Sequence, residues 1–184
     1  MNDVRLQPST ITVRRAPNLG GRPPGTRGVL RLGPLALPCA LGRAGLRSLK
    51  REGDGATPIG AFAVLRVLRR RDRPLAGLPL AVPQGRIART DGWSDDPRDP
   101  AYNRPVRLPR RWRAETLWRD DRLYDAIVVL DYNVRCRSRW RGSAVFWHVA
   151  RDGLEPTEGC VALAPADMRL VLPHLRAGQR VVVA

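Results

Sequence analysis

Apolar and polar residues alternate in short runs through the first third of the chain. Residues 9–15, 28–32 and 35–41 show this period of two, and glycine and proline separate the runs. Successive side chains of a strand point to opposite faces, so the alternation predicts strands, and the turn residues between them predict hairpins. Residues 60–70 continue the pattern over a greater length and predict a longer strand.

The pattern is lost in the middle of the chain. Residues 71–122 are rich in proline, arginine, aspartate and tryptophan, and they show little periodicity. We therefore expect an insertion of irregular structure here. Three large apolar side chains should anchor it to the body of the protein, namely Trp93, Trp112 and Trp118.

Regular patterning returns towards the C-terminus. Residues 123–133 contain a continuous apolar run that predicts a strand buried on both faces, and residues 142–150 predict another. Residues 165–175 begin with proline and carry apolar residues at helical spacing, so they predict a helix. Residues 179–184 predict a final strand.

The expected architecture is one mostly β domain over residues 1–184, with a few short helices and the irregular insertion. A chain of 184 residues suits a single hydrophobic core. No internal repeat or low-complexity linker divides it. The 17 prolines are consistent with a globular fold that has many turns.

The formal net charge of +16 raises the question of an anionic partner. Lys50 is the only lysine, so almost all of the positive charge is carried by arginine. An arginine-rich, solvated surface would give the same composition. No short basic run is interleaved with aromatic residues as a stacking platform for bases requires, so we do not expect a nucleic-acid partner.

Neither a membrane span nor an export signal is visible. No segment approaches the ~20 consecutive apolar residues that cross a bilayer. Residues 1–13 lack the basic and then apolar segments of a secretory signal. The cysteines, Cys39, Cys136 and Cys160, form neither a CxxC pair nor a disulfide framework, and their odd number leaves at least one thiol free.

His148 and Cys160 are the clearest candidates for catalytic residues. His148 lies near the end of a predicted strand and Cys160 begins the next apolar run, with two glycines and a proline between them. Such a segment can turn back and let two neighbouring strands present both side chains at one rim of a sheet. A reactive cysteine needs its thiolate, and an adjacent imidazole can form it. Gly159 has no Cβ, so backbone N–H groups there can approach a substrate carbonyl as an oxyanion hole.

The same residues also admit a purely structural interpretation. Buried cysteines are common, and a lone histidine on an apolar strand is usually a satisfied core residue. A metal site has less support. A catalytic zinc needs three protein ligands, and no two of the candidate ligands His148, His174 and Cys160 are closely spaced in the sequence. We expect no metal and no other cofactor, and we expect His174 to be a surface residue or a helix-capping residue.

Two blocks of sequence resemble one enzyme family. HVARDGLEPTEGCVAL, from His148 to Leu163, resembles the active-site signature of the L,D-transpeptidase (YkuD-like) family, in which a histidine is followed by a Ser/Thr-x-Gly-Cys element. Residues 157–160 match that element. KREGDGATPIGAFAV, residues 50–64, resembles the family's glycine-rich Thr-Pro-x-Gly-x-Phe segment. The order and separation of the blocks also fit, so the resemblance covers about residues 10–184.

This resemblance implies a β-sandwich or barrel fold, and it implies the reaction that the family catalyses. The family's reaction is cysteine-dependent acyl transfer on peptidoglycan stem peptides through a thioester, which forms cross-links in cell wall biogenesis and cell shape maintenance, or exchanges D-amino acids. Cys160 would be the nucleophile, His148 the general base, and the backbone around Gly159 the oxyanion hole. The partners would be donor and acceptor stem peptides. The place of action would be the cell envelope or periplasm, although no signal peptide is visible.

Substrate-binding residues are expected around the nucleophile. Residues 101–109, AYNRPVRLP, are similar to a Tyr-Asn-Arg segment in one branch of such proteins, although a packed loop explains them equally well. Two arginines flank the strand of His148 and can form charge-assisted pairs with stem-peptide carboxylates. The expected substrate-binding residues are Tyr102, Asn103, Arg104, Thr157, Arg151 and Arg141.

The sequence also departs from the family pattern. Many members carry Arg or Asn two residues after the cysteine, whereas this chain has Ala162, so that role is absent or is performed elsewhere. Glu158 is a poor candidate for the base, because a carboxylate beside the cysteine would raise the thiol pKa. We expect it to point outward. We expect a backbone carbonyl to orient the second ring nitrogen of His148.

Two other functions stay open at this level. Water as the acceptor would make the protein an L,D-carboxypeptidase or hydrolase acting on the same peptides. A non-enzymatic, arginine-rich module that binds an anionic cell-envelope polymer would use His148 and Cys160 only structurally. The sequence does not define the oligomeric state, nor whether Cys39 and Cys136 pair.

Overall fold

The computed structural model describes residues 10–17 and 25–184. Residues 1–9, which belong to the segment inspected above for an export signal, lie outside the described residues, as do residues 18–24. Among the described residues, no helix is both long enough and apolar enough to span a bilayer.

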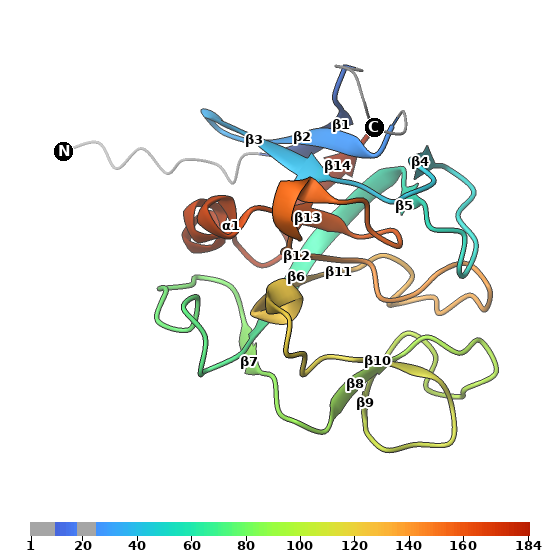
Figure 1. Cartoon of the computed structure of the whole chain (residues 1–184). Helices are drawn as coiled ribbons and strands as arrows, with labels where there is room; N and C mark the ends of the chain where they lie inside the picture. The colour runs from blue at the N-terminus through green and yellow to red at the C-terminus, as the bar shows by residue number, and fades with distance from the viewer. Residues whose placement is uncertain (1–9, 18–24) are drawn as a thin grey trace.

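The main body is a β-barrel (Figure 1). Its strands follow the order β11-β12-β13-β3-β2-β1-β14-β6, and β6 also pairs with β11, so the sheet closes on itself. Closure removes most of the exposed strand edge. The prediction of a mostly β fold is therefore confirmed. The barrel strands are β1 (Ile11–Arg15), β2 (Arg27–Leu32), β3 (Leu35–Ala40), β6 (Gly60–Arg69), β11 (Ala126–Leu130), β12 (Phe146–Val149), β13 (Val161–Leu163) and β14 (Arg180–Val183).

Smaller elements decorate the barrel. β4 (Leu46–Arg47) pairs with β5 (Thr57–Pro58), and β7 (Gln84–Arg86) runs parallel to the end of β6. The predicted C-terminal helix is present as α1 (Pro165–Val171), followed by a 3₁₀ turn over Leu172–His174. Pro173 has no N–H to continue the helix, which accounts for its early end. Further 3₁₀ turns cover Arg122–Tyr124 and Asp152–Leu154.

The insertion carries more regular structure than its sequence suggests. β8 (Asp91–Ser94) lies between β9 (Pro105–Arg107) and β10 (Ala114–Thr116) in a small antiparallel sheet. This sheet lies at the far end of the molecule from β1 and β2 (Figure 1). Strands of three or four residues are too short to show a period of two in sequence.

The tryptophans of the insertion behave as anchors. Trp93 is 1% exposed and packs edge-on against Phe146 of β12, with ring centroids 5.1 Å apart. Trp118 is half-buried beneath the guanidinium of Arg70, 3.4 Å from the ring centroid. Trp112 is half-buried near Arg111. The predicted structural role is confirmed most clearly for Trp93.

Alternation along two central strands positions the site. In β12, Trp147 and Val149 belong to the core inside the barrel, whereas Phe146 packs in a second apolar cluster between the barrel and the insertion. Because side chains alternate along a strand, His148 lies on the same outer face as Phe146. β11 contributes buried side chains to both clusters, as predicted for a strand buried on both faces. The second cluster consists of Leu68, Ile87, Trp93, Leu117, Tyr124, Ile127, Val129 and Phe146.

Candidate active site

His148 and Cys160 line one cavity of about 220 Å³ on the outer face of the barrel. The strands β12 and β13 run parallel, with His148 opposite Ala162, so Cys160 stands two residues before the partner of His148. The insertion and the 3₁₀ turn before β11 form the opposite wall. The cavity is lined by Glu115, Arg119, Leu123, Tyr124, His148, Arg151, Glu155, Pro156, Thr157, Glu158, Cys160 and Ala162.

The thiol of Cys160 is held by the backbone of the preceding loop. Its Sγ donates to the carbonyl of Ala144 at 3.2 Å and accepts from the N–H of Phe146 at 3.4 Å. Burial raises the pKa of the thiol to about 12. The N–H of Phe146 and the charge of Lys50 act in the opposite direction, and the charge of Glu115 raises the pKa further. The cysteine is therefore a neutral thiol at physiological pH.

The imidazole of His148 is a neutral base. Its Nδ1 lies 2.8 Å from the carbonyl oxygen of Val149, and because a carbonyl only accepts, Nδ1 carries the proton. The lone pair is then on Nε2. Burial lowers the pKa of His148 to about 4. The expectation that a backbone carbonyl orients this ring is confirmed.

The backbone at the cysteine is clamped by two threonines. The carbonyl of Cys160 accepts from Thr157 Oγ1 at 2.7 Å and from Thr57 Oγ1 at 3.3 Å, and the N–H of Gly159 donates to Thr157 Oγ1 at 3.1 Å. Gly159 has a φ of 131°, and a Cβ there would lie 2.7 Å from the carbonyl oxygen of Ala56. Only glycine fits such a position. Since Thr57 and Ala56 belong to residues 50–64, the fold brings the two family-like blocks together.

Lys50 stands behind the same turn. Its side chain is 4% exposed, and its Nζ lies 2.8 Å from Asp54 Oδ1. The ammonium lies 3.2 Å from where a Cβ on Gly159 would be. Lys50 is the only lysine of the chain, and its sequence context alone predicts no role for it. Its position in residues 50–64, one of the two family-like blocks, is the sequence feature that could have indicated a place near the active site.

The predicted Tyr-Asn-Arg segment lies outside the cavity lining. Tyr102 and Asn103 are 2% and 1% exposed. The Tyr102 hydroxyl donates to Glu52 Oε2, and the Arg104 guanidinium donates to the carbonyl of Val134. Asn103 Oδ1 accepts from the N–H of Ala144 at 3.1 Å. Through Asn103 the segment holds the residue whose carbonyl binds the thiol.

The other predicted substrate contacts are divided between the cavity and the surface. Thr157 and Arg151 line the cavity, and Arg151 is exposed, with its Nη1 3.9 Å from Glu155 Oε2. Arg141 is exposed and is not among the described residues that line the cavity. Glu158 is paired with Arg43 at 2.8 Å and has a side chain that is 77% exposed, so it points outward as expected.

Three polar residues of the cavity carry no recognisable sequence signal. Tyr124 packs edge-on against the His148 ring, with centroids 5.4 Å apart. Glu115 lies 3.3 Å from the guanidinium of Arg119, which also stands over the Tyr124 ring. Burial raises the pKa of both Glu115 and Tyr124. Glu115 and Arg119 belong to or adjoin β10, in a segment whose sequence has no motif.

The remaining cysteines and histidine lie apart from this cavity. Cys39 is buried and Cys136 is exposed, and both are free thiols. His174 is exposed, as expected. Within residues 10–17 and 25–184, no group of three or more His, Cys, Asp or Glu side chains could hold a metal ion.

Comparisons with known proteins agree with the sequence blocks. A family model described as the L,D-transpeptidase catalytic domain, YkuD, matches residues 28–183. No curated protein matches the chain.

Among solved structures, the chain is similar to an L,D-transpeptidase from Mycobacterium smegmatis, with 13% identity and a TM-score of 0.40 over 95% of this chain. It is also similar to L,D-transpeptidase 1 from Mycobacterium tuberculosis, with 14% identity and a TM-score of 0.39 over 95% of this chain. The chain spans 58% and 61% of the length of these two proteins.

Proposed function

The chain belongs to the YkuD family of L,D-transpeptidase catalytic domains, and we propose that it transfers acyl groups between peptidoglycan stem peptides with Cys160 as the nucleophile. One observation carries this proposal. A free thiol and a neutral imidazole, whose Nδ1 proton is held by a carbonyl, line the same cavity. This combination is what thiol-dependent acyl transfer requires.

The first step forms a tetrahedral intermediate. His148 Nε2 takes the thiol proton while the sulfur attacks the carbonyl carbon of an L-residue that precedes a D-amino acid, and the carbonyl π electrons move to oxygen. Because the thiol pKa is about 12 and the imidazole pKa is about 4, a preformed ion pair is disfavoured. Proton transfer therefore accompanies attack. The N–H of Gly159 already donates to Thr157 Oγ1, so we assign the oxyanion to the N–H of Cys160 beside it.

Collapse of this intermediate then forms the thioester and releases the leaving group, and an acceptor consumes the thioester. Protonated His148 gives its proton to the nitrogen of the departing D-amino acid as the C–N bond breaks. The side-chain amine of a second stem peptide then attacks the thioester and loses a proton to His148. His148 returns this proton to the sulfur as the C–S bond breaks, which restores the thiol. Water in place of the amine gives hydrolysis, and a free D-amino acid gives exchange.

Substrate carboxylates have partners at the rim of the cavity. Arg151 is exposed there and its ion pair with Glu155 is long, so its guanidinium is available to a stem-peptide carboxylate. We assign Thr157 to holding the nucleophile turn while it faces the substrate. Arg141, outside the cavity lining, would contact a more distant part of the substrate.

Tyr102, Asn103 and Arg104 act on the substrate only indirectly in this proposal. Their bonds to Glu52, Ala144 and Val134 hold the loop that carries the thiol acceptor. They are positioning residues behind the cavity. The family's substrate would place the protein at the cell envelope.

Product analysis with matched cysteine variants tests the proposal. Purified muropeptides are incubated with the wild type, with Cys160→Ala and with Cys136→Ala, whose thiol is exposed and outside the cavity. We expect new cross-linked dimers or exchanged termini with the wild type and Cys136→Ala only. Mass spectrometry identifies the products and the donor residue.

Each other result has a defined meaning. Shortened stems without dimers or exchange would identify an L,D-carboxypeptidase. Equal product from Cys160→Ala would refute the cysteine nucleophile. An inactive wild type that is folded, has a reduced thiol and binds an anionic polymer would favour the non-enzymatic module.

A further inference from the structure

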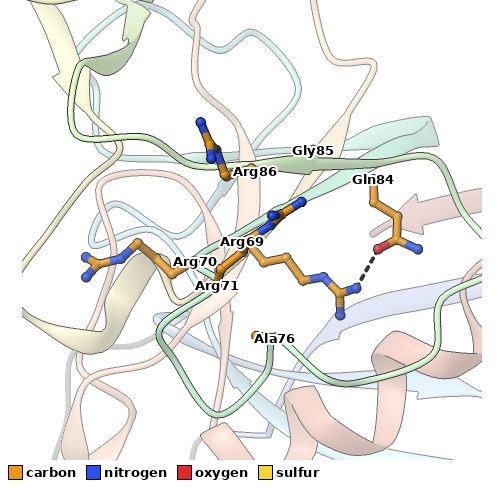
Figure 2. A pocket seen from close by; sticks show the side chains of 7 residues that line it. All are labelled: Arg69, Arg70, Arg71, Ala76, Gln84, Gly85 and Arg86. Carbon is orange, nitrogen blue, oxygen red and sulfur yellow. Dashed lines mark hydrogen bonds between the residues drawn. The ribbon is translucent and has the colours of Figure 1, made fainter.

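A second cavity lies where β6 ends beside β7, and the acyl-transfer mechanism makes no use of it (Figure 2). Its volume is about 190 Å³. Four arginines stand around it, and none of the described residues that line it is acidic. These arginines are Arg69, Arg70, Arg71 and Arg86.

Strand register brings two of the arginines together. β6 and β7 pair in parallel with Arg69 directly opposite Arg86. Paired residues on neighbouring strands project from the same face of the sheet, and like charges in this arrangement destabilise the pairing. Binding of an anion between the strands would offset this cost, which gives a physical reason for two arginines at paired positions.

Arg69 is held in place without being neutralised. Its Nη1 donates to the carbonyls of Leu75 at 3.1 Å and Leu78 at 2.8 Å, and its Nη2 donates to Gln84 Oε1 at 2.5 Å, as Figure 2 shows for the last bond. All three acceptors are uncharged. The guanidinium is therefore oriented in advance and keeps its full charge for a ligand.

The nearby carboxylates are already engaged by other arginines. Asp72 accepts two hydrogen bonds from Arg70, at 2.8 and 2.5 Å, and Asp125 lies 3.4 Å from Arg73. The charge of Arg70 at the cavity is therefore neutralised by Asp72.

Unlike Arg70, Arg71 and Arg86 are not neutralised by a carboxylate of the described residues. Both are exposed, and within the described part of the chain their side chains form no hydrogen bond or ion pair. Together with Arg69 they place three guanidinium charges at one cavity without a carboxylate counter-charge.

We propose that this cavity binds a phosphate group. Arginine guanidinium groups form two parallel hydrogen bonds with phosphate oxygens, and several of them can surround one phosphate. A doubly charged anion balances more of the positive charge around the cavity than a single carboxylate does. The small volume suits the phosphate itself with a few attached atoms, while the rest of the ligand stays outside. The ligand is then either a soluble phosphorylated molecule or the headgroup of an anionic phospholipid.

A double variant tests the site without disturbing the fold. Arg71→Gln/Arg86→Gln removes two exposed charges for which the described residues offer no hydrogen bond or ion pair, and Arg31→Gln/Arg180→Gln removes two exposed charges from β2 and β14 as the matched control. Binding of sn-glycerol 3-phosphate is measured by calorimetry at constant ionic strength, with acetate as the reference anion. Cosedimentation with phosphatidylglycerol vesicles and with phosphatidylcholine vesicles is the second measurement.

We expect the wild type and the control variant to bind glycerol phosphate equally and at least tenfold more tightly than the Arg71→Gln/Arg86→Gln variant. Acetate should not compete. Vesicle binding that depends on Arg71 and Arg86, when glycerol phosphate binds weakly, would identify the lipid headgroup as the source of the phosphate. Equal losses in both double variants would show that only the overall positive charge matters and would overturn the proposal, as would the absence of binding to either probe.

Discussion

At the residue scale, burial and the charge of Glu115 raise the pKa of Cys160, while the N–H of Phe146 and the charge of Lys50 lower it. The apolar surroundings of Cys160 raise its pKa and keep it protonated, whereas the nearby ammonium of Lys50 favours the thiolate. Cys160 is half-buried, and a thiol that is neutral at rest reacts more slowly with oxidants and alkylating agents than a thiolate does. Its reactivity then depends on the groups that stabilise charge as it develops during attack.

Lys50 should therefore control the reactivity of the thiol. Lys50→Met/Asp54→Asn removes the buried ion pair as a unit, so no unpaired charge is left inside. We expect alkylation of Cys160 by iodoacetamide to slow several-fold at pH 8, because the thiolate loses a nearby positive charge. The pH-rate profile of alkylation measures the change. Arg47→Gln, an exposed charge change on β4, serves as the control, and equal slowing in both variants would argue against a specific role for Lys50.

His148 should make the stability of the fold pH-dependent. Its folded pKa of about 4 lies below the ~6.5 of an exposed histidine, so between these values the unfolded chain binds the proton more tightly. The contribution to the free energy of unfolding is complete above pH ~6.5 and is lost as the pH falls towards 4, by about 2 to 3 kcal/mol. Urea unfolding of the wild type and of His148→Gln, at pH 7 and at pH 4.5, measures it. The wild type should lose more stability, and equal losses would count against a buried neutral imidazole.

Spacing made the central residues candidates, and the resemblance to a family singled them out. His148, Gly159 and Cys160 follow one another along the chain across a short turn, and local chain geometry brings such residues together. Tyr124, Glu115 and Arg119 reach the same cavity from the insertion through long-range packing. Nothing local in the sequence records that contact.

At the scale of elements, the loop between β11 and β12 is the critical support. It carries Ala144, which binds the thiol and has a φ of 50°, and it is held by Asn103, which has a φ of 56°. Left-handed backbone at a non-glycine residue is costly, so the surrounding contacts must maintain it. The insertion, through Asn103, therefore maintains the geometry of this loop.

Asn103→Ala should weaken both the fold and the nucleophile. The substitution leaves the N–H of Ala144 and the Nε1 of Trp93 without their acceptor, at a cost of about 1 to 3 kcal/mol each. Thermal unfolding should show the loss of stability. In the folded protein, kcat should fall and the alkylation rate of Cys160 should change, because the Ala144 carbonyl is no longer held.

Trp93→Phe provides the matched comparison for that variant. It removes the indole N–H bond but keeps the bond between Asn103 and Ala144. We expect it to lose stability with little change in the alkylation rate. If Asn103→Ala also left kcat and alkylation unchanged, its role would be structural only.

Elements were predicted well where their patterns are long. The strands around residues 60–70 and 126–130 and the C-terminal helix all carry several periods of their pattern. The sheet of β8, β9 and β10 was not predicted, because each strand has only three or four residues and is stabilised by its partners and by Trp93. Local propensity does not contain that information.

At the scale of the whole molecule, two features matter for function, namely closure of the barrel and the net charge. Closure depends on β1 pairing with β14 from the other end of the chain, and on β6 pairing with both β14 and β11. These non-local pairings cannot be read from periodicity, so the barrel was expected only through the resemblance to a family. Within the closed sheet, β12 and β13 pair directly, which places His148 and Cys160 at one cavity.

The net charge of +16 should accelerate encounter with acidic stem peptides. Raising the ionic strength from ~20 mM to ~200 mM shortens the Debye length from about 20 Å to below 10 Å. We expect kcat/KM to fall several-fold over this range while kcat changes little, since the exposed arginines act on association. Steady-state kinetics at a series of salt concentrations measures both constants. A fall in kcat at constant KM would instead place the salt effect on the chemical step.

The thioester itself is the most informative species to detect. Wild-type protein is mixed with donor muropeptide, stopped with acid within seconds and analysed by intact-protein mass spectrometry, beside Cys160→Ala and Cys136→Ala. We expect an added mass equal to the donor acyl group on the wild type and on Cys136→Ala, removed by hydroxylamine and mapped to Cys160 by peptide analysis. Product formation by Cys160→Ala, or an acyl group on another residue, would contradict nucleophilic catalysis by Cys160.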